Sequence, residues 1–217
     1  KLDQLLPATD LDIHVGIDCG HGGIDPNTGK YVTAPAKMDT HYFGNVYEGV
    51  VNRKIGQVLA QKLKALDVPY TFLSHEWQDT SLRSRTNKAN SIEGCVTISI
   101  HNNYFKDSNV HGFEVFTSPG NTTSDKLAEN IYLAAEETEQ FKMRPDLSDG
   151  DHDKEARFHM LTDTIGTAVL VEFDFFSNPE KAYLMKYSQE WVEMCAQVLV
   201  DGLIATTALK SRSYPQK

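Results

Sequence analysis

Four residues of this sequence combine side-chain types and positions that could support metal-dependent hydrolysis. His21 lies in a glycine-rich stretch, His101 ends a run of apolar residues, and Glu172 lies near the end of another such run. Glu48 begins a segment with helical periodicity. Two imidazoles and one carboxylate, with a fourth position left for water, are the usual ligands of catalytic zinc in hydrolases. A further carboxylate outside the ligand set is then needed to move the proton of the activated water.

In this scheme His21, Glu48 and His101 supply the ligands and Glu172 is the base. The three ligands lie far apart in the sequence and match no short metal-binding motif such as HExxH. Each of them also has a simpler interpretation, as a polar residue at the rim of a sheet. Glu172 differs, because a carboxylate inside TAVLVEFDFF (167–176) is costly to bury without a partner.

These side chains must be positioned by a sheet, because apolar and helical segments alternate along the chain. The most continuously apolar segment, 167–173, should lie in the middle of a mostly parallel sheet, since helices cover both faces of such a strand. The segment 112–118 alternates apolar and polar residues and is typical of a strand near an edge. The predicted strands are 12–18, 68–74, 95–101, 112–118 and 167–173.

Helices are predicted where apolar residues recur at steps of three and four. They cover 48–67, 81–93, 124–141, a segment that begins at Asn178-Pro179, and 188–209. We therefore expect a single-domain α/β fold with a mostly parallel central sheet of about six strands and helices on both faces. In such open sheets, ligands bind at the carboxyl ends of the strands, where His21, His101 and Glu172 lie.

The chain has 217 residues, a length that suits one α/β domain. We expect this domain to cover residues 12–209, with an N-terminal extension at 1–11 and a C-terminal tail at 210–217. Between the helix at 124–141 and the strand at 167–173, the polar segment 142–157 predicts a long loop.

Composition excludes several classes of function. There are 21 Lys and Arg residues against 30 Asp and Glu residues, and the resulting net charge of -9 argues against a nucleic-acid partner. No apolar run reaches the ~18–20 residues that a membrane-spanning helix needs, so we expect no membrane span. Cys19, Cys95 and Cys195 are odd in number and far apart, which predicts buried free thiols rather than disulfides or a thiolate metal site.

Several motifs together resemble one known family, the zinc-dependent N-acetylmuramoyl-L-alanine amidases of amidase type 3. They are GHGGIDP (20–26), Glu48 followed by Asn52, and a stretch that leads from Leu82 to SIHNN (99–103). The last motif is AVLVEFDFFSNPE (168–180). Each is short, but their order and spacing are specific, and the resemblance covers residues 13–205.

The resemblance implies one Zn²⁺ ion held by His21, Glu48 and His101, with Glu172 as the catalytic residue. It also implies hydrolysis of the amide bond between N-acetylmuramic acid and L-alanine in peptidoglycan. We accordingly expect peptidoglycan as the partner and the cell envelope as the location, either periplasmic or secreted; a phage lysin fits as well. The expected oligomeric state is a monomer.

Other residues receive secondary roles. Asn102, Asn103 and Arg157 are candidate substrate-binding residues, because they follow or approach the predicted ligands. Arg85 is expected to pair with a carboxylate inside the fold. The stretch 24–47 is longer than the family pattern and could act as a lid or an autoinhibitor; its His41 is expected to be an exposed loop histidine.

Two alternative functions stay open. One is a zinc peptidase or deacetylase that acts on cell-wall material with a similar metal set. The other is a non-catalytic wall-binding module that has kept the fold. Product analysis separates the enzymes, since only the amidase leaves a peptide-free glycan and a new L-alanine amino group.

Overall fold

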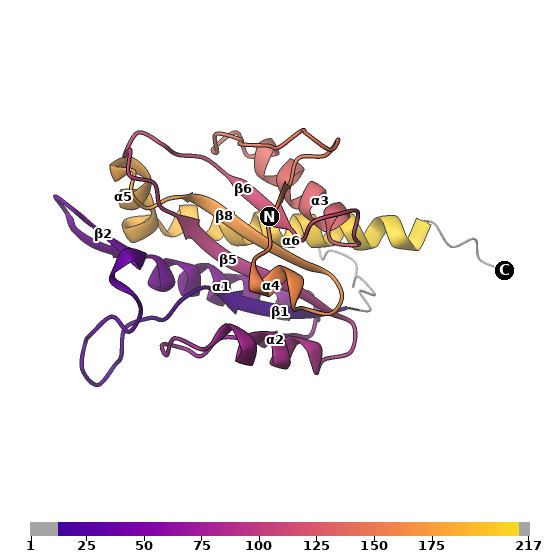
Figure 1. Ribbon diagram of the computed structural model, residues 1–217, viewed down its shortest axis with the longest axis horizontal. Coiled ribbons are helices and arrows are strands. Elements are labelled where there is room, and N and C mark those ends of the chain that lie inside the picture. The colour runs from indigo at the N-terminus through magenta and orange to yellow at the C-terminus, as the bar shows by residue number, and fades with distance from the viewer. Residues whose placement is uncertain (1–12, 213–217) are drawn as a thin grey trace, which may run out of the picture.

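A six-stranded sheet forms the centre of the protein in the computed structural model, which describes residues 13–212 (Figure 1). The predicted extension 1–11 and the end of the predicted tail, 213–217, lie outside the described residues. The strand order is β4-β1-β5-β8-β6-β7. The strands are β1 (His14–Cys19), β4 (Tyr70–Phe72), β5 (Cys95–Asn103), β6 (Glu114–Thr117), β7 (Lys154–Glu155) and β8 (Ala168–Phe175).

The four strands β4, β1, β5 and β8 are parallel, whereas β6 is antiparallel to β8 and β7 is parallel to β6. This confirms the predicted α/β class and the central position of β8. Nearly all residues of β8 (AVLVEFDF) are buried, because both faces of the sheet are covered by helices. The parallel strands β1, β5 and β8 have their carboxyl ends at one edge of the sheet, where the predicted site residues lie.

Helices cover both faces of the sheet (Figure 1). One face packs against α1 (Glu48–Ala65), α3 (Asp125–Glu137) and α6 (Gln189–Arg212), and the other against α2 (Leu82–Asn90) and α4 (His159–Thr162). Between β8 and α6 lies α5 (Pro179–Tyr187). The predicted apolar stripe of α1 is buried, with the side chains of Val51, Ile55, Leu59 and Leu63 in the core. Among residues 13–212, no helix is both long and apolar enough to cross a membrane.

The structure differs from the sequence prediction in short elements. Residues 154–155 form β7 within the predicted loop, because they add hydrogen bonds to the edge strand β6. The long stretch 24–47 contains η1 (Pro35–Lys37) and a hairpin of β2 (Met38–His41) and β3 (Gly44–Tyr47). The last helix, α6, extends past 209 into the predicted tail. Such short elements depend on tertiary contacts more than on a local pattern.

Candidate metal centre and active site

Three of the four residues singled out from the sequence converge at the carboxyl edge of the sheet. His21, Glu48 and His101 each offer a ligand atom, and these atoms lie within 4.8 Å of one another. His101 Nδ1 is 2.9 Å from Glu48 Oε1, and His21 Nε2 is 3.2 Å from Glu48 Oε2. The two imidazole rings are nearly perpendicular, with centroids 5.0 Å apart. Two imidazole nitrogens, each able to bind a metal ion, therefore lie next to one carboxylate.

Each ligand comes from a different element. His21 follows β1 and has a left-handed backbone with φ of 63°. Glu48 is the first residue of α1, and His101 lies in β5. The approach of these elements requires glycine, because a Cβ atom at Gly20 would lie 2.2 Å from the His101 ring and one at Gly49 would lie 1.8 Å from the Gly22 carbonyl oxygen. The glycine-rich motif therefore lets the His21 loop lie directly against α1 and β5.

Two buried arginines hold the loop that carries His21. Arg85 donates hydrogen bonds to Asp18 Oδ1 at 2.8 Å, to the Cys19 carbonyl at 2.8 Å and to the His21 carbonyl at 3.2 Å. Arg85 is 2% exposed, so its ion pair with Asp18 is internal, which confirms the prediction that it pairs within the fold. Arg53, from α1, donates to the carbonyl oxygens of His21 and His75, both at 2.8 Å.

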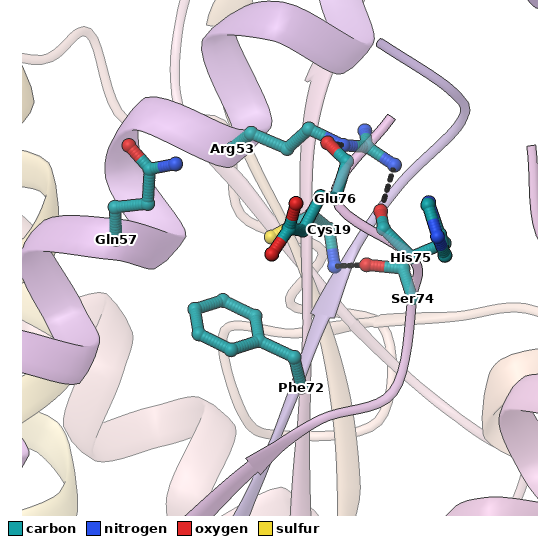
Figure 2. A pocket seen from close by; sticks show the side chains of 7 residues that line it. All are labelled: Cys19, Arg53, Gln57, Phe72, Ser74, His75 and Glu76. Carbon is teal, nitrogen blue, oxygen red and sulfur yellow. Dashed lines mark hydrogen bonds between the residues drawn. The ribbon is translucent and has the colours of Figure 1, made fainter. Parts of the chain in front are cut away.

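Figure 2 shows Arg53 at a pocket of about 300 Å³, with its guanidinium group directed to the backbone carbonyl of His75. Cys19 lies at this pocket, and its backbone N–H donates to Ser74 Oγ at 3.1 Å. Burial raises the pKa of the Cys19 thiol to about 12, so the thiol is neutral and a poor nucleophile. Within the described residues all three cysteines are free and buried, as predicted.

The contacts between Glu48 and His101 shift the pKa values of both side chains. Burial by itself raises the pKa of Glu48, but the hydrogen bond with His101 and the neighbouring His21 imidazole outweigh burial and lower it to about 2. Burial lowers the pKa of His101, but the hydrogen bond to Glu48 and the nearby carboxylates raise it overall. A pocket of about 360 Å³ lies beside His21 and His101 and forms the cleft of the site.

The unpaired atoms of the site fit a bound cation. His21 Nε2 is buried and, although close to Glu48, makes no hydrogen bond. Buried polar atoms are rarely left unpaired in folded proteins. A metal ion between His21, Glu48 and His101 would satisfy this nitrogen, and imidazole and carboxylate are ligands that Zn²⁺ accepts.

Glu172 lies beside this group and outside it. Glu172 is paired in register with His101 on the adjacent strand, and its Oε2 atom is buried with no hydrogen-bond partner. Burial and the nearby carboxylates of Glu48 and Glu114 raise its pKa to about 8, against the opposing influence of His101 and Lys37. A carboxyl group with a raised pKa can both accept and release a proton near neutral pH.

The two asparagines after His101 have different positions. Asn102 is 1% exposed, and its side-chain amide donates to Asn52 Oδ1 at 2.9 Å. Asn52 in turn donates to the Gly20 carbonyl at 3.1 Å and lies 3.5 Å from Glu48 Oε1. Asn102 therefore supports the ligand Glu48 from inside the fold rather than facing substrate.

Asn103 leads to a residue that the sequence analysis missed. Its side-chain amide donates to Glu114 Oε2 at 2.9 Å, and Glu114 also accepts from Arg144 at 2.8 Å and from Lys154 at 2.6 Å. Burial raises the pKa of Glu114, but these hydrogen bonds lower it overall. Glu114 pairs in register with Glu172 on β8. The only signal in the sequence was a glutamate in an alternating strand, which is too common to indicate a site.

Arg157 lies on the segment that joins β7 to α4. The Ala156 backbone N–H donates to the carbonyl of Thr117, at the far end of β6 from Glu114, and the Phe158 ring packs against Phe116. Arg157 is exposed, and its contact with substrate stays a prediction.

The stretch 24–47, which we call the insertion, is attached to the site. His41 lies in β2 with a side chain that is 5% exposed, and its Nε2 is 2.9 Å from the Phe176 carbonyl oxygen. The prediction of an exposed loop histidine is therefore wrong, because the hairpin packs against the chain that follows β8. The insertion also places Lys37 Nζ 3.8 Å from Glu48 Oε2, a contact that the sequence analysis did not predict.

Comparison with known proteins identifies the family. The family model described as N-acetylmuramoyl-L-alanine amidase matches residues 15–205. An N-acetylmuramoyl-L-alanine amidase from Clostridium difficile 630 is 24% identical, with a TM-score of 0.76 over 93% of this chain and 98% of that chain. The amidase AmiC2 of Nostoc punctiforme is 22% identical, with a TM-score of 0.73 over 91% and 97% of the two chains.

A third similar structure is the catalytic domain of the CD27L endolysin, which targets Clostridium difficile. It is 21% identical, with a TM-score of 0.67 over 89% of this chain and 97% of that chain. No curated protein sequence matches this chain. The structural likenesses establish the shared fold, and the family model covers most of the chain. The chain therefore belongs to the N-acetylmuramoyl-L-alanine amidase family, whose members act on peptidoglycan.

Proposed function

We propose that this protein uses one Zn²⁺ ion, held by His21, Glu48 and His101, to hydrolyse the amide bond between N-acetylmuramic acid and L-alanine. The observation that carries the proposal is the convergence of these three ligand atoms within 4.8 Å of one another. Glu172, with its unpaired and buried Oε2, lies on the adjacent strand. Family membership supports the identity of the cleaved amide bond, and the residues support metal-dependent hydrolysis as the type of reaction.

A bound zinc ion supplies Lewis acidity and lowers the pKa of a coordinated water to about 7. Glu172 accepts the proton of the attacking water at its carboxylate and later donates it to the departing amine nitrogen. A cation held by His21, Glu48 and His101 would favour the charged form of the Glu172 carboxyl group, because opposite charges at short range stabilise each other. The pKa of Glu172 is about 8 without a cation, so a bound cation would lower this pKa toward neutral pH.

The surrounding residues keep the reacting groups in place. Arg53 and Arg85 fix the His21 loop through its carbonyl oxygens, and Asn52 lies beside Glu48. Such partners hold a ligand in one orientation and strengthen metal binding. Of the three candidate substrate contacts, we retain Asn103, which lies half-buried at the end of β5, and the exposed Arg157.

We further propose that residues 12–209 form the catalytic unit, and that the protein acts as a monomer on peptidoglycan in the cell envelope. A periplasmic protein, a secreted protein and a phage lysin all fit this role. Support comes from the family and from a structural neighbour that is described as an endolysin. Light scattering of the purified protein tests the monomer, since a dimer would double the measured mass.

The test of the proposed function is a digest of soluble muropeptides with zinc-loaded protein, analysed by mass spectrometry. We expect free stem peptides with a new L-alanine amino terminus and a glycan without peptide. Cleavage within the peptide would identify a peptidase, and loss of acetyl groups would identify a deacetylase. Unchanged muropeptides at any metal concentration would indicate a non-catalytic module and would contradict the proposal.

A further inference from the structure

The insertion brings a positive charge to the metal ligands. Lys37 is the last residue of η1, and its Nζ lies 3.8 Å from Glu48 Oε2. Its side chain is 41% exposed, so it contacts Glu48 and is also accessible to solvent. Of the ion pairs among the described residues, Lys37 takes part only in this one.

The backbone of Lys37 is fixed by hydrogen bonds. Its carbonyl oxygen accepts from the hydroxyl group of Tyr31 at 3.0 Å, and its N–H donates to the Ala34 carbonyl at 3.0 Å. The same Tyr31 hydroxyl accepts from the backbone N–H of Gly49 at 3.2 Å. Lys37 is thus tied, through one tyrosine, to the first turn of α1, in which Glu48 is the first residue.

A second set of contacts anchors the rest of the insertion. The Tyr31 ring packs against Tyr47 with centroids 4.6 Å apart, and Thr33 donates a hydrogen bond to Asp79. The hairpin that follows is held at its tip by Lys186, which donates to the Phe43 carbonyl at 3.1 Å. These contacts fix the insertion beside the first turn of α1, so the backbone that carries Lys37 is held next to Glu48.

The charges around Lys37 indicate what it can meet. When a divalent cation binds Glu48, the negative charge of this carboxylate is shared with that cation, and the ammonium group of Lys37 is left without a full counter-charge. A half-exposed cation at the rim of a metal site attracts a negatively charged oxygen of the substrate. Amide hydrolysis creates such an oxygen, since the carbonyl oxygen gains a full negative charge when water adds to the carbon.

We propose, on the basis of the proposed amidase function, that Lys37 is a further catalytic residue whose ammonium group donates a hydrogen bond to the scissile carbonyl oxygen as that oxygen becomes negative. In this step the bond from the water oxygen to the carbonyl carbon forms, one O–H bond of the water breaks as its proton moves to Glu172, and the electron pair of the C=O π bond moves to the oxygen. This electron pair then re-forms the C=O bond as the C–N bond breaks, and the departing amine nitrogen takes the proton from Glu172. Lys37 keeps all its protons and contributes only charge and hydrogen bonding.

The test compares Lys37→Met and Lys37→Arg with the parent protein on a soluble muropeptide. Lys30→Met is the matched control, because Lys30 is an exposed lysine in the same insertion. We expect Lys37→Met to lower kcat about 100-fold, the typical effect of losing one oxyanion donor. KM and zinc content should stay within threefold of the parent, Lys37→Arg should recover part of kcat, and Lys30→Met should match the parent.

A binding measurement provides a readout besides turnover. The probe is a phosphinate analogue of the muramoyl–L-alanine bond, whose tetrahedral anionic group resembles the charged state of the reacting carbon. Its affinity should fall in Lys37→Met by about the same factor as kcat. The affinity for uncleaved muropeptide, measured in the Glu172→Gln background, should be unchanged by Lys37→Met.

Three results would overturn the role of Lys37. A kcat within twofold of the parent would exclude it from the reaction. A rise in KM alone would mean that Lys37 binds a carboxylate of the intact substrate. Tighter zinc binding with an unchanged kcat would mean that Lys37 only balances the charge of Glu48. If the parent itself fails to cleave muropeptides, the proposed function fails, so the two failures are distinguishable.

Discussion

His101 and Glu172 are paired in register on β5 and β8, the two central parallel strands. Residues paired in this way point their side chains to the same face of a sheet, so a proposed metal ligand and a half-buried acid lie side by side. The pairing continues to Glu114 on β6, which is buried. A row of three polar side chains thus crosses the centre of the sheet, where such groups are costly unless they are paired.

The first prediction concerns Glu172 as the group that moves the proton. Glu172→Gln keeps the size of the side chain but cannot accept a proton, so kcat on muropeptides should fall at least about 100-fold. Zinc content, measured by elemental analysis, should stay at one ion per chain because Glu172 is not a ligand. A matched control is Glu155→Gln, because Glu155 is exposed and its carboxylate accepts a hydrogen bond from the Gly120 backbone N–H. Parental turnover in Glu172→Gln would show that another group carries the proton.

The second prediction concerns metal binding and stability. His101→Ala removes one of the three ligands, and both metal content and muropeptide cleavage should be lost. Zinc at about 1,000 times its Kd should stabilise the parent by about 4 kcal/mol, seen as a rise in Tm that chelation reverses. Arg157→Ala is the control and should retain this zinc-dependent shift, since Arg157 is exposed and is not one of the three proposed ligands. An unchanged zinc shift in His101→Ala would place the ion elsewhere.

The third prediction concerns Asn52, which links Glu48 with Asn102 and Gly20. Asn52→Ala removes the amide that lies beside the ligand, and we expect zinc affinity to fall about 10- to 100-fold. Competition with a chromophoric chelator measures this change. The variant should also lose about 1–3 kcal/mol of stability, because it leaves buried partners without hydrogen bonds. Asn87→Ala, at an exposed position on α2, should change neither quantity.

The fourth prediction concerns Asp153 and the pH dependence of the free energy of unfolding. Asp153 is 3% exposed, and burial together with the nearby Asp151 and Asp125 raises its pKa from 3.8 to about 7, despite a hydrogen bond from Thr117. The folded protein therefore binds this proton more tightly than the unfolded chain does. The resulting stability is complete below about pH 4 and is lost as the pH rises through about 7.

Asp153→Asn removes this ionisation and leaves a neutral group of the same shape. We expect the free energy of unfolding of the variant to exceed that of the parent at pH 8 by at least about 1 kcal/mol, and the difference to disappear near pH 4. Urea unfolding at a series of pH values measures both. Asp149→Asn, at an exposed position, serves as the control. A parent that is more stable than Asp153→Asn at pH 8 would contradict the assignment.

Much of the fold could be predicted from local sequence pattern. The continuous apolar run around Glu172 indicates a central strand, because a strand covered on both faces is apolar along its whole length. The stripe that includes Ile55 and Leu59 indicates the helix α1, because a helix buried on one face has apolar residues at steps of three and four. The motifs around His21 and His101 also indicate the ligands. These features depend on neighbours in the chain, so the sequence carries them directly.

The tertiary structure decided which other polar side chains reach the site. Lys37 is brought to it by the insertion, and Glu114 by the pairing of β6 with β8. Asn102 is buried, and its side-chain amide donates a hydrogen bond to Asn52 of α1. No local pattern predicts these outcomes. The direction of a side chain depends on strand direction and on hydrogen bonds between residues far apart in the sequence, and both exist only once the chain has folded.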